Sequence, residues 1–323
     1  MASDLAVSIV IPVRDEAGSI GSLIHSIGRQ VRQPDEIVMV DGGSTDGTVA
    51  LVRRLTAGDE RYRIIEAGVS TPGRGRNVGI EAAAHPWVAL TDAGIELDAG
   101  WLDRLARVAE HDGRLDVVYG SFRPGRGSFF ERCADLAYVA PLAPTPVGPV
   151  RSRSIASCLL RKDAWRRAGG FPDMRAAEDL VFMRALEAAG ARAGTAPEAW
   201  VTWQLEPTFA GTFTRFRRYS KHNVRAGLQK DWHHGVARQY LAAAALVAGA
   251  RRIDRSPRPL LLAAAGLRVG RTIWRRREGR GVAWALRPDR FVTVAAILAV
   301  IDAATFLGWL DASVEGRHER RTA

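Results

Sequence analysis

Short apolar runs alternate with segments of helical period over the first 230 residues, and this pattern predicts an α/β domain. Residues 7–13 form a β-branched apolar run that is typical of a buried strand. Residues 19–30 place four apolar side chains on one helical face: Ile20, Leu23, Ile24 and Ile27. A second apolar run follows at residues 36–40. A strand, a helix and a strand of these lengths predict a βαβ unit with parallel strands.

The same alternation continues down the chain. Further strands are expected at residues 62–67, 87–91, 117–119, 154–161 and 199–203, and further helices at residues 48–55, 73–84, 101–110, 176–189 and 213–227. Residues 122–150 are rich in Gly, Pro and apolar residues without a clean period. We expect that segment to form a flexible loop or a flap over the substrate.

Acidic and glycine-rich residues follow the first two expected strands. Arg14, Asp15 and Glu16 follow the first, and residues 41–46 follow the second with the sequence DGGSTD. Ligands of parallel sheets bind beyond the carboxyl ends of the strands. The candidate site is therefore expected at the tips of these two strands.

A third polar segment, GRGRNVG at residues 73–79, opens an expected helix. Backbone N–H groups at a helix N-terminus bind anions, and Arg74 and Arg76 would add charge-assisted contacts. The alternative is an ordinary turn with solvated arginines. We favour the anion-binding interpretation.

The segments IPVRDE and VDGGSTDGT, at this spacing, resemble the opening of family 2 glycosyltransferases, whose catalytic domain has the GT-A fold. The resemblance continues through RNVG, DAG, GGF and ED, and it covers roughly residues 7–227. It implies a Rossmann-like nucleotide-diphospho-sugar transferase domain at residues 1–230, with Asp41 contacting the base of a nucleotide-sugar donor. The donor-binding residues that it implies are Pro12, Val13, Arg14, Glu16, Asp41, Gly43, Ser44, Arg74, Arg76, Asn77, Asp92, Ala93, Arg218 and Lys221.

The same resemblance assigns the catalytic base. Acidic residues in a first helical turn often only complement the helix dipole. The family, however, places its base in a Glu-Asp pair after a Gly-Gly-Phe turn, which implies Asp179 as the base and Glu178 as its neighbour. The turn itself, Gly169, Gly170 and Phe171, is implied to lie on the acceptor side. One carboxylate that takes the acceptor proton suffices for an inverting displacement.

A divalent cation is implied less directly. The family carries an Asp-x-Asp site for Mg²⁺ or Mn²⁺, and Asp92 matches its first carboxylate, whereas Gly94 stands at the second position. Glu96 either reaches the ion or is a solvated residue of the following helix. Arg74 and Arg76 would share in neutralising the leaving phosphate.

Composition restricts the partners. The 323-residue chain has 46 Lys and Arg against 35 Asp and Glu, a net charge of +11, which favours an anionic partner. Nucleic acid is not expected, because no zinc spacing or RNA-binding aromatic motif is present, which leaves an anionic membrane or a diphosphate substrate. Cys133 and Cys158 are expected to be buried free thiols. Since no signal-peptide pattern opens the sequence, the catalytic part is expected to be cytoplasmic.

Residues 231–323 are expected to form a helical, basic region that associates with membranes or oligomerises. Segments 240–250, 259–269 and 291–310 are Ala-, Leu- and Val-rich and are separated by Arg clusters. The last is long enough to span a bilayer, although a central Asp302 costs about 2.5–3.5 kcal/mol on insertion scales. Residues 271–290 have the Arg and Trp content of an interfacial segment. Surface association, a spanning or re-entrant segment, and a soluble helical cap or homo-oligomer face remain open.

The sequence thus predicts an inverting glycosyltransferase with a hydroxyl acceptor, lipid-linked or part of a cell-envelope glycan, at the cytoplasmic face of the membrane. Two alternatives belong to other classes. A sugar nucleotidyltransferase would carry a glycine-rich signature with a Lys immediately after the first strand, which Arg14-Asp15-Glu16 is not. A non-catalytic membrane-associated scaffold is suggested by Gly94 and disfavoured by Asp92 and Asp179.

Overall fold

The computed structural model describes residues 5–125, 127–252 and 256–322, with side chains described up to residue 315. The chain forms two compact units: Met1–Gly125 with Leu142–Gln204, and Arg126–Pro141 with Leu205–Ala323. The second unit begins before the expected boundary at residue 230, because helix α8 (Phe209–Arg225) packs along helix α13 (Pro288–Thr322).

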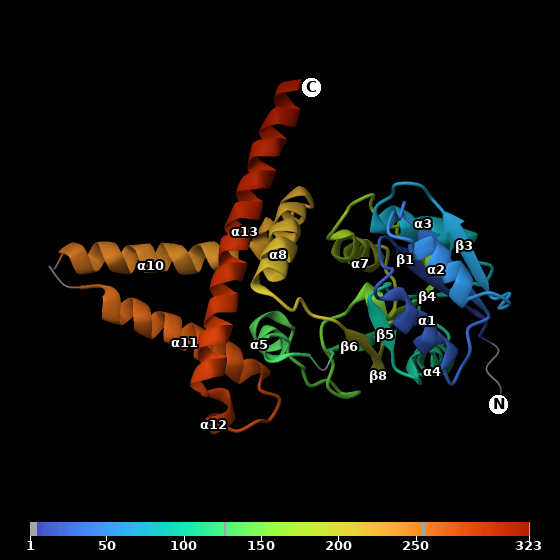
Figure 1. Cartoon of the computed structure of the whole chain (residues 1–323), viewed down its shortest axis with the longest axis horizontal. Coiled ribbons are helices and arrows are strands. Elements are labelled where there is room, and N and C mark those ends of the chain that lie inside the picture. Colours follow the sequence, from blue (N-terminus) through green and yellow to red (C-terminus); the bar gives the residue numbers. More distant parts are fainter. Residues whose placement is uncertain (1–4, 126, 253–255, 323) are drawn as a thin grey trace. The chain divides into compact units, whose positions relative to one another are not determined.

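The first unit is built on a mixed eight-stranded sheet in the order β3-β2-β1-β4-β7-β6-β8-β5, as the described residues define it (Figure 1). Strands β1 and β2 are parallel neighbours, and β1 also pairs in parallel with β4, so the predicted βαβ unit and α/β class are confirmed. The strands are β1 (Val7–Val13), β2 (Glu36–Asp41), β3 (Tyr62–Glu66), β4 (Trp87–Leu90), β5 (Ile95–Leu97), β6 (Val117–Pro124), β7 (Cys158–Arg161) and β8 (Ala193–Trp203).

Helices cover both faces of this sheet. The helices are α1 (Ile20–Gly28), α2 (Thr48–Leu55), α3 (Pro72–Ala82), α4 (Trp101–His111), α6 (Lys162–Arg167) and α7 (Glu178–Ala188). Alternate residues of β1 serve the two faces: Ile9 and Ile11 pack with α1 and α4, whereas Val10 packs with α3 and α7. This alternation is the period-two pattern of a strand that is buried on both sides.

The expectation of a loop at residues 122–150 is wrong for residues 129–138, which form helix α5 (Phe129–Tyr138) of the second unit. Ser128 and Glu131 close a capping box at its start, and one face, which includes Cys133 and Leu136, is buried. The capping box was a readable signal, since Ser-x-x-Glu before an apolar run is typical of a helix start. Cys133 and Cys158 are buried free thiols, as predicted.

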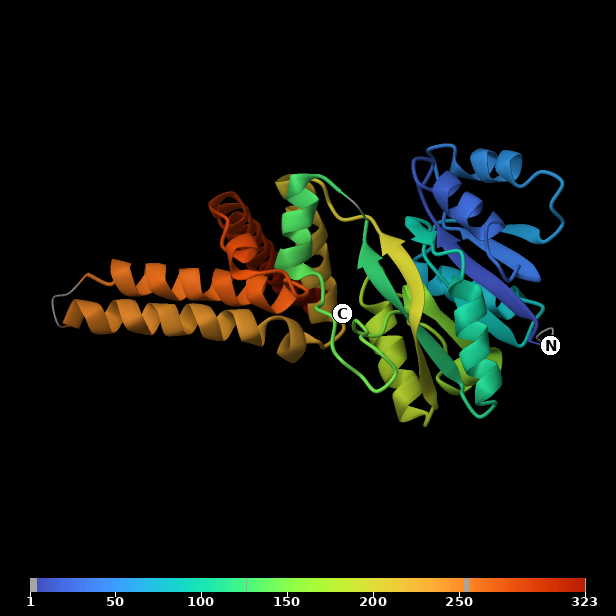
Figure 2. The same cartoon turned by 90° about the horizontal axis from the view of Figure 1, so that it is seen from below.

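The second unit is helical, as expected for the C-terminal segment. Besides α5, α8 and α13 it contains α9 (Gln229–Trp232), α10 (His234–Arg252), α11 (Arg258–Arg276) and α12 (Val282–Ala285). Helices α10 and α11 lie side by side as a hairpin (Figures 1 and 2). Helices α8 and α13 approach closely at Gly308, where a Cβ would lie 2.3 Å from the carbonyl oxygen of Arg217. A glycine is therefore required at that crossing.

Candidate active site

The loops after β1 and β2 bind each other at the carboxyl edge of the sheet. The Asp41 carboxylate accepts hydrogen bonds from the backbone N–H groups of Gly43 (3.0 Å) and Ser44 (3.1 Å). The Asp15 N–H donates to Ser44 Oγ (2.9 Å), and the Asp15 carboxylate accepts from the Thr45 N–H (2.8 Å). The carboxylates of Asp41 and Asp15 therefore hold the two loops in place by hydrogen bonds to backbone N–H groups. Each carboxylate retains lone pairs that could accept a hydrogen bond from a ligand.

Left-handed backbone conformations occur in both of these loops, at Gly43 and at Asp15 among others. Gly43 has φ +82°, and a Cβ there would lie 3.2 Å from Val69 Cα. Asp15 has φ +54°, a conformation that is uncommon for a residue with a side chain. Such strain persists only where neighbours fix it, and here the bonds to Ser44 and Thr45 do so.

The glycines of the GRGRNVG segment lie inside α3 rather than in a loop before it. Helix α3 begins at Pro72, and its N-cap is Thr71, whose side chain accepts from the Arg74 N–H (3.2 Å). A Cβ at Gly79 would lie 2.4 Å from Val10 Cγ1, and one at Gly73 would lie 2.1 Å from the Pro172 carbonyl oxygen. The glycines thus permit close packing of α3 against β1 and against the turn that precedes α7.

This close packing places the Arg76 guanidinium between two carboxylates from other elements. Arg76 Nη1 lies 2.7 Å from Glu178 Oε1 at the start of α7, and Nη2 lies 2.6 Å from Asp92 Oδ1 beyond the end of β4. The Arg76 side chain is only 5% exposed, whereas Arg74 is exposed. The structure therefore brings together Arg76, Asp92 and Glu178, three of the residues implied by the resemblance.

Asp179 follows Glu178 in the first turn of α7 and is half-buried. Desolvation raises the pKa of Asp179 above its ordinary value, and the charge of Arg76 opposes that shift. Burial likewise raises the pKa of Glu178 against the opposing effect of Arg76. Ala177, the N-cap of α7, has φ +67°. Like Asp15, it is a non-glycine residue with a left-handed backbone, and it directly precedes Glu178 and Asp179. A carboxylate with a raised pKa is a stronger base, which suits proton abstraction from a hydroxyl.

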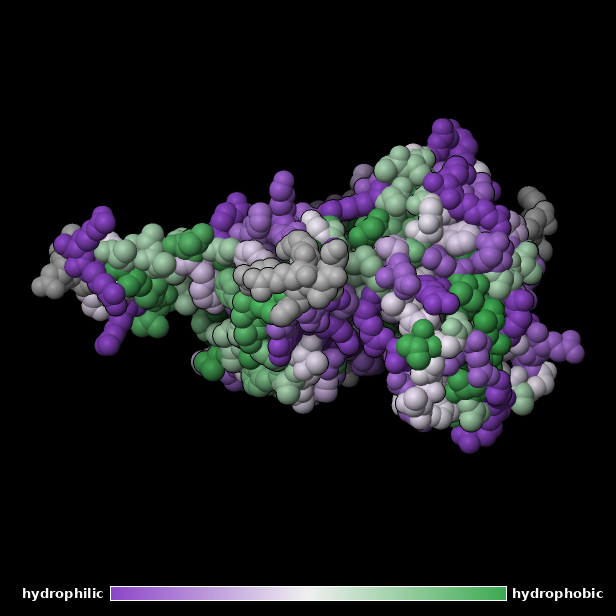
Figure 3. Space-filling model, turned by 90° about the horizontal axis from the view of Figure 1, so that it is seen from above, coloured by the Kyte–Doolittle hydropathy of each residue, from purple (hydrophilic) through white to green (hydrophobic). Residues whose placement is uncertain are grey.

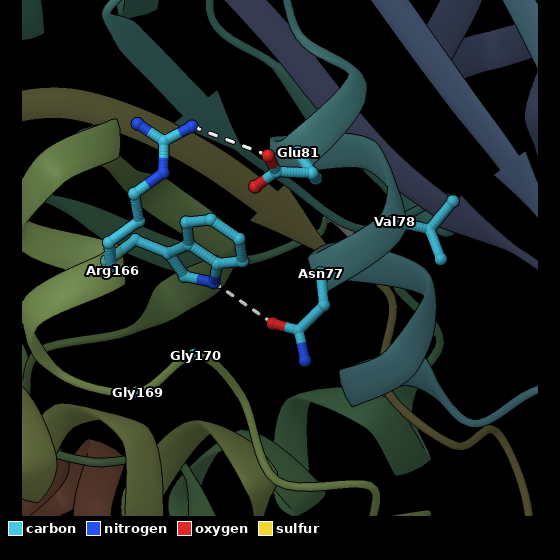
Figure 4. Close-up of a pocket in the computed structure, with 7 residues that line it drawn as sticks. Asn77, Val78, Glu81, Arg166, Gly169 and Gly170 are labelled. Atoms are coloured by element: carbon cyan, nitrogen blue, oxygen red, sulfur yellow. Dashed lines mark hydrogen bonds and ion pairs between the residues drawn. The ribbon is translucent and has the colours of Figure 1, made fainter.

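The Asn77 amide of α3, drawn with Gly169 and Gly170 in Figure 4, fastens the Gly-Gly-Phe turn. Asn77 Oδ1 accepts from the Phe171 N–H (2.8 Å) and from Trp165 Nε1 (3.0 Å), and Asn77 Nδ2 donates to the Phe171 carbonyl (2.8 Å). Gly169 and Gly170 have φ +80° and +74°. The turn borders an open pocket of about 500 Å³, lined by Asn77, Val78, Glu81, Trp165, Arg166, Gly169 and Gly170. No local sequence pattern selects Trp165, which lies 88 residues from the Asn77 amide that it binds.

The carboxylates do not form a ready cation site. Asp92 has one oxygen bound to Arg76, and Gly94 offers no ligand. Glu96 is not on a helix but is an exposed residue of strand β5, where it pairs with Arg29 at 3.2 Å. Within the described residues, no group of three or more His, Cys, Asp or Glu side chains could hold a metal ion. The residues present therefore do not fit a resident divalent cation.

The remaining predicted residues occupy different places. Pro12 and Val13 end β1, Arg14 Nε lies 3.7 Å from Asp15, and Ala93 is buried after β4. The Glu16 carboxylate lies close to Gly94, with Oε2 at 3.8 Å from where a Cβ would stand. The other two residues, Arg218 and Lys221, belong to α8 of the second unit, where Lys221 Nζ lies 2.6 Å from Glu315 Oε1. A role for them in donor binding stays a prediction.

Among the buried polar atoms of the first unit that lack a hydrogen-bond partner in the described residues, three lie near the carboxyl edge of the sheet: Ser70 Oγ, Arg76 Nε and Thr91 Oγ1. Ser70 packs beside Gly42 after β2, Arg76 lies in α3, and Thr91 follows β4. Buried polar groups are normally satisfied. Their position at the same edge of the sheet indicates a site for a polar ligand.

Comparisons with known proteins agree with this geometry. The sequence model described as "Glycosyl transferase family 2" matches residues 8–157. Glycosyltransferase AglE of Haloferax volcanii is 31% identical over 132 residues, which are 39% of this chain and 43% of AglE. An uncharacterized glycosyltransferase of Mycobacterium tuberculosis is 36% identical over 129 residues, which are 39% of this chain and 53% of that protein. The chain thus spans about half the length of these relatives.

A solved structure extends the likeness to the fold. The mannosyltransferase PcManGT from Pyrobaculum calidifontis, in complex with GDP-Man and Mn²⁺, superposes with a TM-score of 0.60 at 23% identity. The match covers 95% of this chain and 90% of PcManGT. The two proteins share the GT-A fold, which confirms the predicted fold class.

Proposed function

Residues 8–157 of this chain belong to glycosyl transferase family 2, and from this premise we propose that the protein transfers a sugar from a nucleotide-diphosphate donor to a hydroxyl acceptor with inversion. The observation that carries the proposal is the cluster around Arg76. A buried guanidinium binds Asp92 and Glu178, and Asp179 follows next in the chain. The cluster combines a cation suited to phosphate with a carboxylate of raised pKa.

The donor is proposed to lie along the edge formed by the first two strand tips and α3. Asp41 and the loop of Gly43 and Ser44 face the nucleoside, and the orphan groups of Ser70 and Thr91 offer further hydrogen bonds. Arg76 and the exposed Arg74 lie on α3, where they supply positive charge for the diphosphate. GDP-Man occupies the structure of PcManGT, and we extend only the class, a nucleotide-diphosphate sugar, to this chain.

Asp179 is proposed as the general base of a single displacement. As the acceptor oxygen attacks the anomeric carbon, its proton passes to the Asp179 carboxylate. The bond from that carbon to the diphosphate oxygen breaks, and the nucleoside diphosphate leaves while Arg76 and Arg74 neutralise its charge. Glu178 holds Arg76 in place through the 2.7 Å ion pair.

The acceptor and location are proposed from the second unit. Its helix α13 contains a stretch, Pro288–Glu315, that is long and apolar enough to span a membrane, and 39% of it is buried within the protein. Apolar side chains exposed on neighbouring helices add to this surface. We propose a lipid-linked or cell-envelope glycan acceptor at the cytoplasmic face of a membrane.

The test compares Asp179→Asn with the control Asp173→Asn, which alters an exposed carboxylate bonded to Thr71. Release of nucleoside diphosphate from the donor sugar, in the presence of membrane extract as the acceptor source, is measured together with donor affinity. Asp179→Asn should lower turnover by about 100- to 10,000-fold and leave donor affinity within about threefold. Turnover equal to that of the control would refute the role of Asp179.

The scaffold alternative, which Gly94 favours, makes the opposite prediction for the wild-type protein. A scaffold releases no nucleoside diphosphate from any donor sugar, whatever residue stands at position 179. A nucleotidyltransferase would instead release pyrophosphate from a nucleoside triphosphate and a sugar phosphate. The same assay therefore separates all three functions.

A further inference from the structure

We propose that the hairpin of α10 and α11 is the membrane-binding element, and that it lays its apolar side chains into the interfacial region of an anionic phospholipid bilayer. Helix α13, in contrast, is the packed spine of the second unit. The inference deepens the proposed membrane location and is independent of which sugar the first unit transfers.

The hairpin exposes large apolar side chains on both of its helices. Residues 241–250 of α10 read LAAAALVAGA without one charge, and Leu241 is 69% exposed. On α11, Leu262 and Leu267 are each 73% exposed. In Figure 3 hydrophobic residues gather along this part of the second unit, and hydrophilic residues lie toward its end. Contiguous exposed apolar surface of this kind marks a binding face.

The charge on the hairpin is of one sign. Helices α10 and α11 carry eight arginines and no acidic residue: Arg238, Arg251, Arg252, Arg258, Arg268, Arg271, Arg275 and Arg276. Arg268 forms an ion pair with Asp302 of α13. Helices that carry both guanidinium groups and exposed leucines match an interface in which phosphate headgroups border acyl chains.

Helix α13 is held by contacts that insertion into lipid would break. Asp302 is 2% exposed, and its carboxylate accepts from Arg268 Nη1 (2.5 Å) and Nη2 (2.8 Å) and from the Tyr240 hydroxyl (2.8 Å). Gly308 packs against the backbone of α8. Breaking a buried ion pair leaves an uncompensated charge, which is strongly unfavourable. Asp302 therefore fastens both helices of the hairpin to the spine, and the hairpin is the part left free to meet lipid.

Charge also argues against a second copy of this chain as the occupant of the hairpin face. Two copies that paired through this face would place their arginines opposite one another, since the face has no acidic side chain among its described residues. Like charges brought together at an interface oppose association. An anionic bilayer relieves the same repulsion.

The experiment measures vesicle binding of the full chain by co-sedimentation. Vesicles of equal parts phosphatidylcholine and phosphatidylglycerol are compared with vesicles of phosphatidylcholine alone. The test variant combines Leu262→Gln with Leu267→Gln. Its matched control combines Val31→Gln with Val147→Gln, two first-unit positions that are 75% and 59% exposed. All four substitutions are at exposed side chains, so the fold should be kept, and a melting temperature for each variant verifies this.

The wild-type protein and the control should bind the anionic vesicles. The partition coefficient of the test variant should be at least about tenfold lower than that of the control. A polarity-sensitive dye on a cysteine introduced by Leu262→Cys should brighten with these vesicles, whereas the same dye after Val31→Cys should not. Equal binding of the test variant and the control would overturn the proposal. So would a lipid-independent dimer, seen by light scattering, that the test variant dissociates.

Nucleotide binding separates this proposal from the function of the first unit. Each variant is also tested for stabilisation by nucleoside diphosphates. Vesicle binding lost in the test variant with nucleotide binding retained supports the hairpin as a separate membrane element. Wild-type protein that binds nucleotide but no anionic vesicle refutes the hairpin proposal alone, whereas vesicle binding without nucleotide binding refutes only the donor site.

Discussion

Both units pair an arginine with a buried carboxylate, but for different purposes. In the first unit Arg76 lies between Glu178 and Asp92, at a strand edge where further polar atoms lack partners. In the second unit Arg268 and Asp302 satisfy each other, and Tyr240 adds a third bond. The first cluster retains bonding capacity toward a ligand, whereas the second is closed. Buried charge thus indicates a functional site only where part of its hydrogen bonding is left open.

The units also differ in where they keep apolar surface. The first unit packs apolar side chains into two buried clusters, one on each face of the sheet, and its exposed apolar side chains include Val31 and Val147. The second unit exposes leucines along α10 and α11. This difference fits the proposal that the first unit acts on an acceptor at a lipid surface.

The largest expected effect comes from opening the cluster of the first unit. Arg76→Met should lower the free energy of unfolding by about 3–5 kcal/mol, because it leaves Glu178 buried without its cation. Urea denaturation measures the change. The control Arg74→Met removes an exposed arginine of the same helix and should cost less than about 0.5 kcal/mol. Equal costs for both variants would mean that Arg76 is not the centre of a buried network.

A smaller loss is expected at the helix crossing of the second unit. Gly308→Ala places a methyl group against the backbone of α8 and should destabilise the protein by about 1–3 kcal/mol. Gly270→Ala, in α11 with open space around it, is the matched control. It should stabilise by about 0.5–1 kcal/mol, since alanine is the better helix former. Thermal denaturation of both variants measures these changes in stability. A gain in stability for Gly308→Ala would contradict the close crossing of α8 and α13.

A third substitution asks whether the first unit can regain a cation site. Gly94→Asp restores the second carboxylate of the Asp-x-Asp pattern, and the nearest atom to its Cβ would be Glu16 Oε2 at 3.8 Å. We expect Mn²⁺ to strengthen donor binding about tenfold more in this variant than in the wild-type protein. Calorimetric titration measures the difference, with Gly94→Ala as the control. If Gly94→Asp and Gly94→Ala respond alike, the carboxylate count at this position does not set the cation dependence.

The smallest expected effect is a displacement of the pH profile. The pKa of Asp179 is raised above its ordinary value of 3.8. On acidification the carboxylate therefore takes up its proton, and kcat/KM falls, at a pH that is higher than 3.8. The activity is present above the raised pKa and is lost as the pH falls through it. Arg76 lowers the pKa of Asp179, so Arg76→Met should move the acid limb to higher pH. A limb that stays in place or moves to lower pH would remove Asp179 as the titrating group.

The first unit could be predicted from its sequence because its signals are local. The apolar runs at residues 7–13 and 36–40 became β1 and β2 in the expected parallel pair, and the helical period at residues 19–30 became α1. A clear hydrophobic period within each element and short connections between the elements leave few alternative topologies. The candidate residues near Asp92 and Glu178 were accessible only through the family resemblance.

What could not be predicted depends on contacts between distant residues. Asn77 binds Trp165 and Phe171, which lie 88 and 94 residues away. No local sequence pattern indicates hydrogen bonds between residues so far apart. Glu96 was expected on a helix or at an ion, yet three residues around it form an edge strand that pairs with β8. In the second unit, the charge of Asp302 is unfavourable in an apolar helix, and its partner Arg268 lies 34 residues away on another helix, where no local pattern indicates the pair.

The most direct test of the central claim is a thermal-shift measurement of the full chain with UDP, GDP, dTDP and their sugars, with and without Mn²⁺. The account predicts that nucleotides of one base stabilise the protein, by about 2.7 kcal/mol at a concentration a hundred times the dissociation constant. It also predicts that Arg76→Met loses most of this stabilisation, whereas Asp179→Asn retains it. Wild-type protein that shifts with none of these ligands would contradict the account and favour a scaffold.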